Sequence, residues 1–142
     1  MTLGVVAAAF AAGFISVIVF HQGVWALWRA AGKAPGPPWN LKPVPPLGVP
    51  AVISSSFWGG LWGIVLLWLL PIAAPSMGYW PAAIILGALL TSIVALMVVA
   101  PIKRRPFAGG WKLPAWVFAL SVNAAWGFGT GLLLRAFGAV AA

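Results

Sequence analysis

Four apolar stretches, each about as long as a membrane-spanning helix, dominate this sequence. A hydrocarbon core of about 30 Å requires roughly 20 apolar residues in a helix. We identify four such stretches, at residues 3–27, 52–70, 81–100 and 114–134. Proline disrupts a helix interior but is tolerated in the first turn, so prolines near the boundaries predict helix ends. These are Pro50, Pro71, Pro81, Pro101 and Pro114. We therefore expect an all-α membrane protein with four transmembrane helices, in one domain spanning residues 1–142.

The composition leads to the same class and excludes several kinds of chemistry. Hydrophobic residues make up 63% of the chain and charged residues only 6%, against about 25% charged in a soluble domain. The chain has no Asp, Glu or Cys. It therefore lacks a carboxylate pair for hydrolysis, carboxylate ligands for hard cations and thiolate ligands for metals. We expect a protein that is not an enzyme and that holds no metal site.

The basic residues predict an orientation in the membrane. Seven of the eight cations fall in two loops, between the first and second apolar stretches and between the third and fourth: Arg29, Lys33, Lys42, Lys103, Arg104, Arg105 and Lys112. The positive-inside rule places such loops in the cytoplasm. We therefore expect an up-down bundle in a bacterial inner membrane (cytoplasmic or intracytoplasmic), with both termini on the periplasmic or exterior side. The only other cation, Arg135, lies near the end of the fourth stretch.

The same cations suggest lipid as a partner. They are too few for a nucleic-acid-binding surface and are not arranged on a soluble basic face, so we expect no nucleic-acid partner. We expect Lys103, Arg104 and Arg105 to orient the chain and to contact anionic lipid.

The first loop, residues 32–50, contains seven of the thirteen prolines. Such a composition favours extended polyproline-like backbone over helix. The loop is then either a stiff connector along the membrane surface or a segment that docks a partner subunit through Trp39. The sequence leaves both interpretations open.

Small residues spaced four apart predict where the helices pack. Helices in lipid associate through close backbone contact, which small residues permit, and residues four apart share a helix face. The clearest sets are Gly59 and Gly63 in the second stretch and Asn123, Gly127 and Gly131 in the fourth. The other two stretches carry Ala8, Ala12 and Ser16, and Ala83, Gly87, Thr91 and Ala95. We expect the Asn123 carboxamide to form a hydrogen bond with another helix.

The only histidine, His21, precedes Gln22 near the end of the first stretch. At a rise of 1.5 Å per residue it lies about 12 Å from Arg29, inside the hydrocarbon region. His21, with Gln22 as its neighbour, is thus a candidate cofactor site. His21 could be an axial ligand of haem or a bacteriochlorophyll, a hydrogen-bond donor to a quinone, or a proton relay. It could instead be a neutral imidazole bonded to another helix through Asn123 or the serines at 54–56.

Four segments carry a resemblance: "FHQGVWAL", "PPLGVPAVISSSFWGGLWGI", "PIKRRPFAGGW" and "NAAWGFGTGLLL". Together they resemble a group of small four-span bacterial integral membrane proteins. This resemblance implies the fold and no activity. The chain also slightly resembles antenna polypeptides, but Val17 stands where those chains carry a small residue four positions before the histidine.

These features favour a non-catalytic accessory subunit of a larger bacterial membrane complex, of the respiratory or photosynthetic electron-transfer kind. Its partners would be other membrane subunits and bound lipid. The alternative is a small oligomeric transporter or channel for neutral or anionic solutes, which would need a polar face lining a pore.

Overall fold

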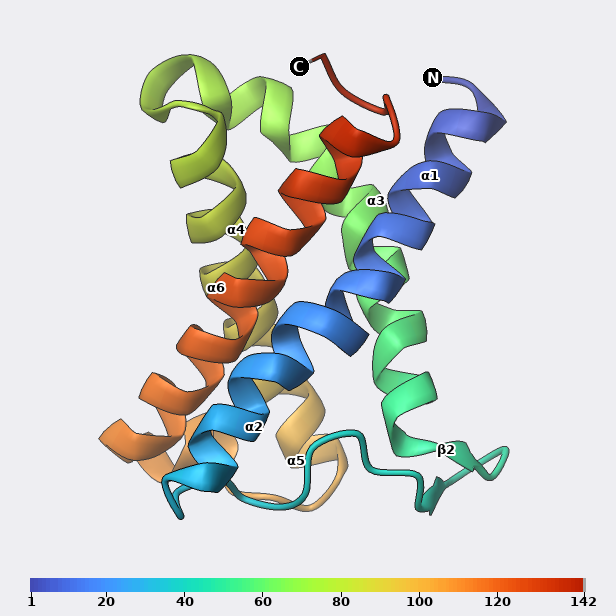
Figure 1. The fold of residues 1–142 in the computed structure, drawn as a ribbon. Helices are drawn as coiled ribbons and strands as arrows, with labels where there is room; N and C mark the ends of the chain where they lie inside the picture. The colour runs from blue at the N-terminus through green and yellow to red at the C-terminus, as the bar shows by residue number, and fades with distance from the viewer. Residues whose placement is uncertain (142) are drawn as a thin grey trace.

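The structure is a computed structural model, and it describes residues 1–141. It is mostly helical, and four of its helices are long and apolar enough to cross a membrane: Leu3–Ala30, Ala51–Met77, Tyr79–Ile102 and Leu113–Ala136. Both chain ends lie at one end of the molecule, and the segments around β2 and α5 lie at the other (Figure 1). The predicted class, an all-helical protein with four candidate membrane spans, is confirmed.

Two of the four long helices contain short π-helical segments. The first consists of α1 (Leu3–Ser16), the π segment Val17–His21 and α2 (Gln22–Ala30). The third consists of α4 (Tyr79–Val94), the π segment Ala95–Val99 and α5 (Ala100–Ile102). The second and fourth are α3 (Ala51–Met77) and α6 (Leu113–Ala136).

Both loops at the α5 end contain some regular structure. Within the proline-rich loop, β1 (Pro43–Val44) pairs antiparallel with β2 (Val49–Pro50). A short 3-10 turn, Phe107–Trp111, precedes α6.

The prolines predict the helix starts better than the helix ends. Pro50 precedes α3, and Pro114 lies in the first turn of α6. The prediction that Pro71 ends the second helix is wrong, because α3 continues through Pro71 and Pro75 to Met77. Pro71 comes about 30 Å along α3, a length equal to the thickness of a hydrocarbon core, and beyond such a core water can satisfy a carbonyl that proline leaves unbonded.

Helix α1 packs against α3 with backbone in contact with backbone. A Cβ atom on Gly13 would collide with the carbonyl oxygen of Gly59, and one on Gly63 would collide with that of Ala9. Gly59 and Gly63 therefore lie in the contact that their spacing predicted. In α1 the contact uses Ala9 and Gly13, one residue away from the predicted set that begins at Ala8.

Helix α4 packs against α6 in the same manner. A Cβ atom on Gly87 would lie 2.6 Å from the Cα atom of Gly127, and one on Gly127 would collide with the carbonyl oxygen of Ala83. A Cβ atom on Gly131 would lie 2.9 Å from the Cβ atom of Ala83. The Tyr79 hydroxyl donates to the Gly131 carbonyl at 2.6 Å. Gly127 and Gly131 thus lie in the α4–α6 contact.

The two helix pairs use equivalent residues. Ala9 and Gly13 in α1 correspond to Ala83 and Gly87 in α4, since each set faces a glycine on its partner helix, Gly63 or Gly127. That glycine follows a tryptophan in both pairs, Trp62 in α3 and Trp126 in α6. The bundle therefore contains two similar helix pairs, α1–α3 and α4–α6.

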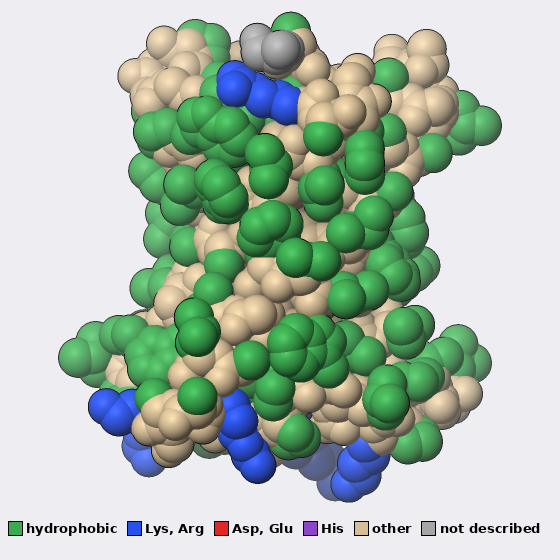
Figure 2. Space-filling model, in the orientation of Figure 1, with side chains coloured by type: hydrophobic (Ala, Val, Ile, Leu, Met, Phe, Trp, Pro, Cys, Tyr) green, Lys and Arg blue, Asp and Glu red, His purple; other side chains and the backbone are tan. Residues whose placement is uncertain are grey.

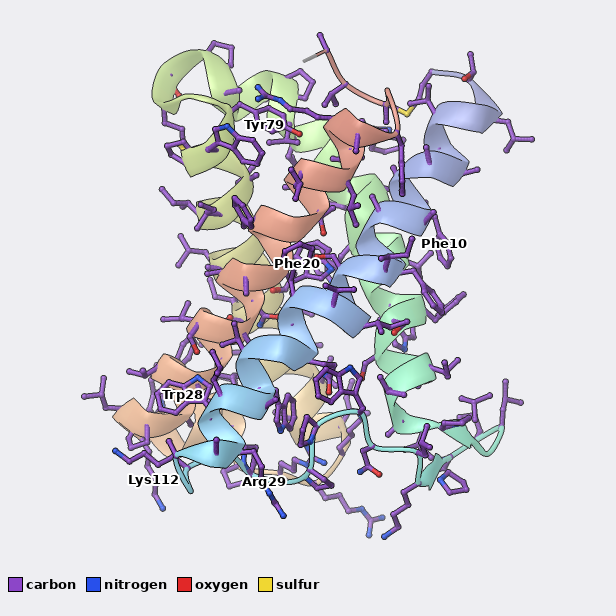
Figure 3. The ribbon with its side chains drawn as sticks, viewed as in Figure 1. Phe10, Phe20, Trp28, Arg29, Tyr79 and Lys112 are labelled. Atoms are coloured by element: carbon purple, nitrogen blue, oxygen red, sulfur yellow. The ribbon has the colours of Figure 1, made fainter. Side chains whose placement is uncertain are left out.

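Trp126 joins the two pairs. Its side chain is only 3% exposed, and its Nε1 donates to the Gly13 carbonyl at 3.0 Å. A second hydrogen bond joins the same two helices, because the Ser16 hydroxyl donates to the Trp126 backbone carbonyl at 2.7 Å. Next to them, the Phe20 ring lies between the first helix and α6 (Figure 3), with its centroid 6.0 Å from that of Phe128.

Candidate site at the histidine and the proline-rich loop

His21 lies where the first helix changes its hydrogen-bonding pattern. It is the last residue of the π segment, and the Gln22 backbone N–H donates to the carbonyl of Val17, five residues back. Such π segments inside α-helices occur frequently at functional sites. The Gln22 side chain is 5% exposed, whereas His21 is half-buried. The pair thus combines a buried Gln22 with a half-buried His21.

The proline-rich loop folds back onto this point through Trp39. The Trp39 backbone N–H donates to Gln22 Oε1 at 2.7 Å. The Trp39 indole Nε1 donates to the carbonyl of Ile18 at 2.8 Å. The Gln22 amide nitrogen, Nε2, lies 3.0 Å from His21 Nδ1. Trp39 is therefore anchored on the first helix of its own chain.

The expectation that His21 bonds Asn123 or the serines at 54–56 is wrong. Its hydrogen-bonding neighbour is Gln22. The Asn123 amide instead donates to the Ser92 hydroxyl at 2.9 Å, which links α6 to α4 as the expected bond between helices. The pairing with Gln22 arises because Trp39 orients the Gln22 carboxamide toward the imidazole.

This network fixes the tautomer of a neutral His21. Gln22 Oε1 accepts the Trp39 backbone N–H, so the Gln22 NH₂ group faces the imidazole. An amide NH₂ group can only donate, so Nδ1 must be the accepting ring nitrogen, and the ring proton resides on Nε2. Within residues 1–141 the Nε2–H group has no hydrogen-bond partner.

The tautomer bears on the proposed roles of His21 as a ligand. A histidine that binds a metal through Nε2 carries its proton on Nδ1 and donates it to an acceptor. Here Gln22 presents a donor to Nδ1. This arrangement suits donation of a hydrogen bond from Nε2 to a carbonyl better than ligation of haem iron or the magnesium of a bacteriochlorophyll.

Tryptophans surround the site on the loop side. The Trp25 ring lies 5.9 Å from the His21 ring, centroid to centroid, and Trp25 Nε1 donates to the Gly36 carbonyl of the loop at 2.9 Å. On the side of α6, the Trp25 ring meets Phe118 edge-on at 4.8 Å. These contacts hold the loop and the end of the first helix together.

The remaining predicted residues lie at the two ends of the molecule. Lys103, Arg104 and Arg105 are exposed and follow α5. Lysine and arginine side chains gather at the end of the molecule that carries the two loops (Figure 2), where Arg29 and Lys112 also lie (Figure 3). At the other end, the Arg135 guanidinium lies 3.8 Å from the centre of the Tyr79 ring.

Comparison of the chain with protein-family models, curated proteins and solved structures gave no match.

Replacing Trp39 with alanine should release the loop. Two hydrogen bonds from Trp39, each contributing about 1 kcal/mol, hold the loop on the first helix. The substitution removes the bond from the indole and weakens the bond from the backbone N–H. We expect trypsin to cleave the exposed bond after Lys33 about tenfold faster in Trp39→Ala than in the unmodified protein. Leu47→Ala is the control, because Leu47 belongs to the same loop and is 84% exposed. Equal cleavage rates in the two variants would contradict the anchoring role.

Proposed function

We propose that this protein is a non-catalytic accessory subunit of a larger bacterial inner-membrane complex, of the electron-transfer kind. One observation carries the proposal: α3 turns large aromatic side chains outward. Phe57, Trp58 and Trp68 are 47%, 58% and 61% exposed. Aromatic residues of this kind are enriched where subunits meet.

Trp58 provides the sharpest argument for a protein neighbour. It lies about 10 Å along α3 from Ala51, and its indole N–H makes no hydrogen bond to any described residue. An indole N–H in an apolar environment usually finds a hydrogen-bond partner. A helix of a neighbouring subunit would supply apolar contact for the ring and an acceptor for this group.

The charge distribution supports an orientation for this subunit. We place the end with the two loops in the cytoplasm, following the positive-inside rule, so the four helices cross in alternating directions with both termini outside. Lys103, Arg104 and Arg105 would then face the inner leaflet. Each basic residue near an anionic surface contributes about 1 kcal/mol of attraction, so anionic lipids are expected partners at this end.

The interior gives little support to the alternative, an oligomeric transporter or channel. A cavity between α3, α4 and α6 has a volume of about 10 Å³, and Trp62, Gly87 and Trp126 contribute to its apolar lining. This volume is near the minimum needed to hold one water molecule. A solute path is therefore not expected between α3, α4 and α6 at this point.

Site-specific photo-crosslinking in native membranes tests the proposal. A photoreactive amino acid in place of Trp58 should yield a protein adduct of defined mass. The same amino acid in place of Leu89, a 47% exposed residue of α4, should yield lipid adducts. Purification in mild detergent should recover the crosslinked protein as a stoichiometric companion. Lipid adducts alone, crosslinks only to a second copy, or equal protein yields at both positions would overturn the accessory-subunit proposal.

A further inference from the structure

We infer that His21, with the Trp25 ring beside it, binds the carbonyl oxygen of a membrane-resident amphiphile through its Nε2–H group. This inference concerns a small-molecule site, and it does not depend on which protein contacts α3. It starts from the chain of hydrogen bonds that links the loop to the first helix.

The hydrogen bonds run in one direction and end at His21. The Trp39 backbone donates to Gln22 Oε1 at 2.7 Å, and Gln22 Nε2 donates to His21 Nδ1 across 3.0 Å. Each group in the series accepts at one atom and donates at another, and such chains polarise one another cooperatively. The last donor, His21 Nε2–H, has no acceptor among residues 1–141. Its complement is a hydrogen-bond acceptor.

The surroundings of this donor resemble a ligand site rather than a helix contact. Gln22 is 5% exposed and its amide is hydrogen-bonded at both ends, while His21 is half-buried. The Trp25 ring lies 5.9 Å away, and Trp39 leaves 45% of its surface exposed. A directed polar group beside an aromatic ring is the kind of feature that fixes the orientation of a small apolar ligand.

Depth in the membrane restricts the chemistry of the ligand. His21 lies about 12 Å along the helix from Arg29, so the charged phosphates of lipid head groups would lie nearer Arg29 than His21. A carbonyl carried below the head groups can reach it. Two sources offer one: the ester of a glycerolipid and the ring of an oxidised quinone. The chain contains no carboxylate that could accept the hydroxyl proton of a quinol, which favours the carbonyl form of a quinone over its reduced form.

Nitrogen-15 NMR tests the inference directly, because the chain contains a single histidine. Protein labelled with nitrogen-15 histidine would be placed in nanodiscs of three kinds: ester-linked phospholipid, ether-linked phospholipid without ester carbonyls, and the ether-linked lipid with added decylubiquinone. We expect Nε2 to carry the proton in all three. A downfield shift of the Nε2–H proton in the ester-linked discs identifies a lipid ester as the ligand. A downfield shift that occurs only when decylubiquinone is added identifies a quinone as the ligand. A proton on Nδ1, or an identical Nε2–H signal in all three, would overturn the inference.

Two variants separate binding from a merely structural role. Gln22→Glu offers acceptor oxygens to both Trp39 and His21, so the ring proton should move to Nδ1 and the ligand-dependent shift should disappear. His21→Phe keeps a ring but removes the donor. Native mass spectrometry should find about tenfold less bound ligand on His21→Phe than on the wild-type protein, because the variant has lost one hydrogen bond. The ligand measured is the molecule that shifted the wild-type NMR signal. Retention of that molecule at wild-type level by His21→Phe would contradict the proposed site.

Discussion

Alanine in place of Gly13 should separate α1 from α3 and lower the free energy of unfolding by about 1–3 kcal/mol, the usual cost of overpacking a core. The new Cβ atom would collide with the carbonyl oxygen of Gly59, and it would approach the Cα atom of Gly63 to 3.0 Å. Both obstacles are backbone atoms, so a change of rotamer cannot relieve them. The two helices would have to move apart along the whole contact.

The same substitution at Gly23 provides a matched control on the same long helix. No atom lies within 4 Å of the position that a Cβ atom on Gly23 would occupy. Alanine has a higher helix propensity than glycine by up to about 1 kcal/mol, so Gly23→Ala should be neutral or stabilising. Unfolding in detergent mixtures of increasing SDS content, followed by tryptophan fluorescence, measures both variants. Equal midpoints for Gly13→Ala and Gly23→Ala would show that the α1–α3 contact is not as close as described.

The helix contacts could be predicted from the sequence where glycines themselves recur four positions apart. Gly59 and Gly63 do so, as do Gly127 and Gly131, and this spacing places each pair on one side of its helix. In α1 the run "AAAFAAGF" contains small residues on several faces. Composition therefore could not distinguish Ala8 from Ala9, and Gly13, which forms the closest backbone contact there, was missed.

The site around His21 shows a different limit of local reasoning. The sequence predicts that the imidazole lies inside the hydrocarbon region, and it names Gln22 as the neighbour of His21 in the candidate site. It could not identify the orienting partner, because Trp39 lies 17 positions beyond Gln22 and reaches it only after the loop folds back. The π segment Val17–His21 adds a second difficulty, because it shifts all later residues relative to the face expected from a regular spacing of four.

Pro71 shows why a local rule can fail in a membrane. Proline removes one backbone donor from a helix and crowds the preceding turn, which predicts an end at this residue. The helix nevertheless continues through Pro71 and Pro75 to Met77, and proline is tolerated in transmembrane helices where water or neighbouring groups satisfy the freed carbonyl. The helix ends instead at Gly78, whose φ of +89° favours glycine.

Removing the Trp126 side chain should produce the largest loss of stability of any single substitution considered. Trp126→Ala is expected to lower the free energy of unfolding by about 3–5 kcal/mol, the range for deleting a buried aromatic side chain. The indole is 3% exposed, and its bond to the Gly13 carbonyl at 3.0 Å joins the α4–α6 pair to the α1–α3 pair. No sequence pattern distinguishes this role, because Trp126 is one of ten tryptophans.

Two further variants separate the contributions of Trp126. Trp126→Phe retains most of the ring volume and loses the indole donor, so it should cost about 1 kcal/mol for the hydrogen bond in addition to a smaller packing loss. Trp58→Ala is the matched control, because Trp58 is 58% exposed and its removal leaves no internal cavity. In the purified protein Trp58→Ala should change the SDS midpoint little, whereas Trp126→Ala should shift it strongly. If Trp58→Ala destabilised the isolated protein as much as Trp126→Ala, Trp58 would be a residue of the core, and the outward face of α3 could not be the docking surface proposed above.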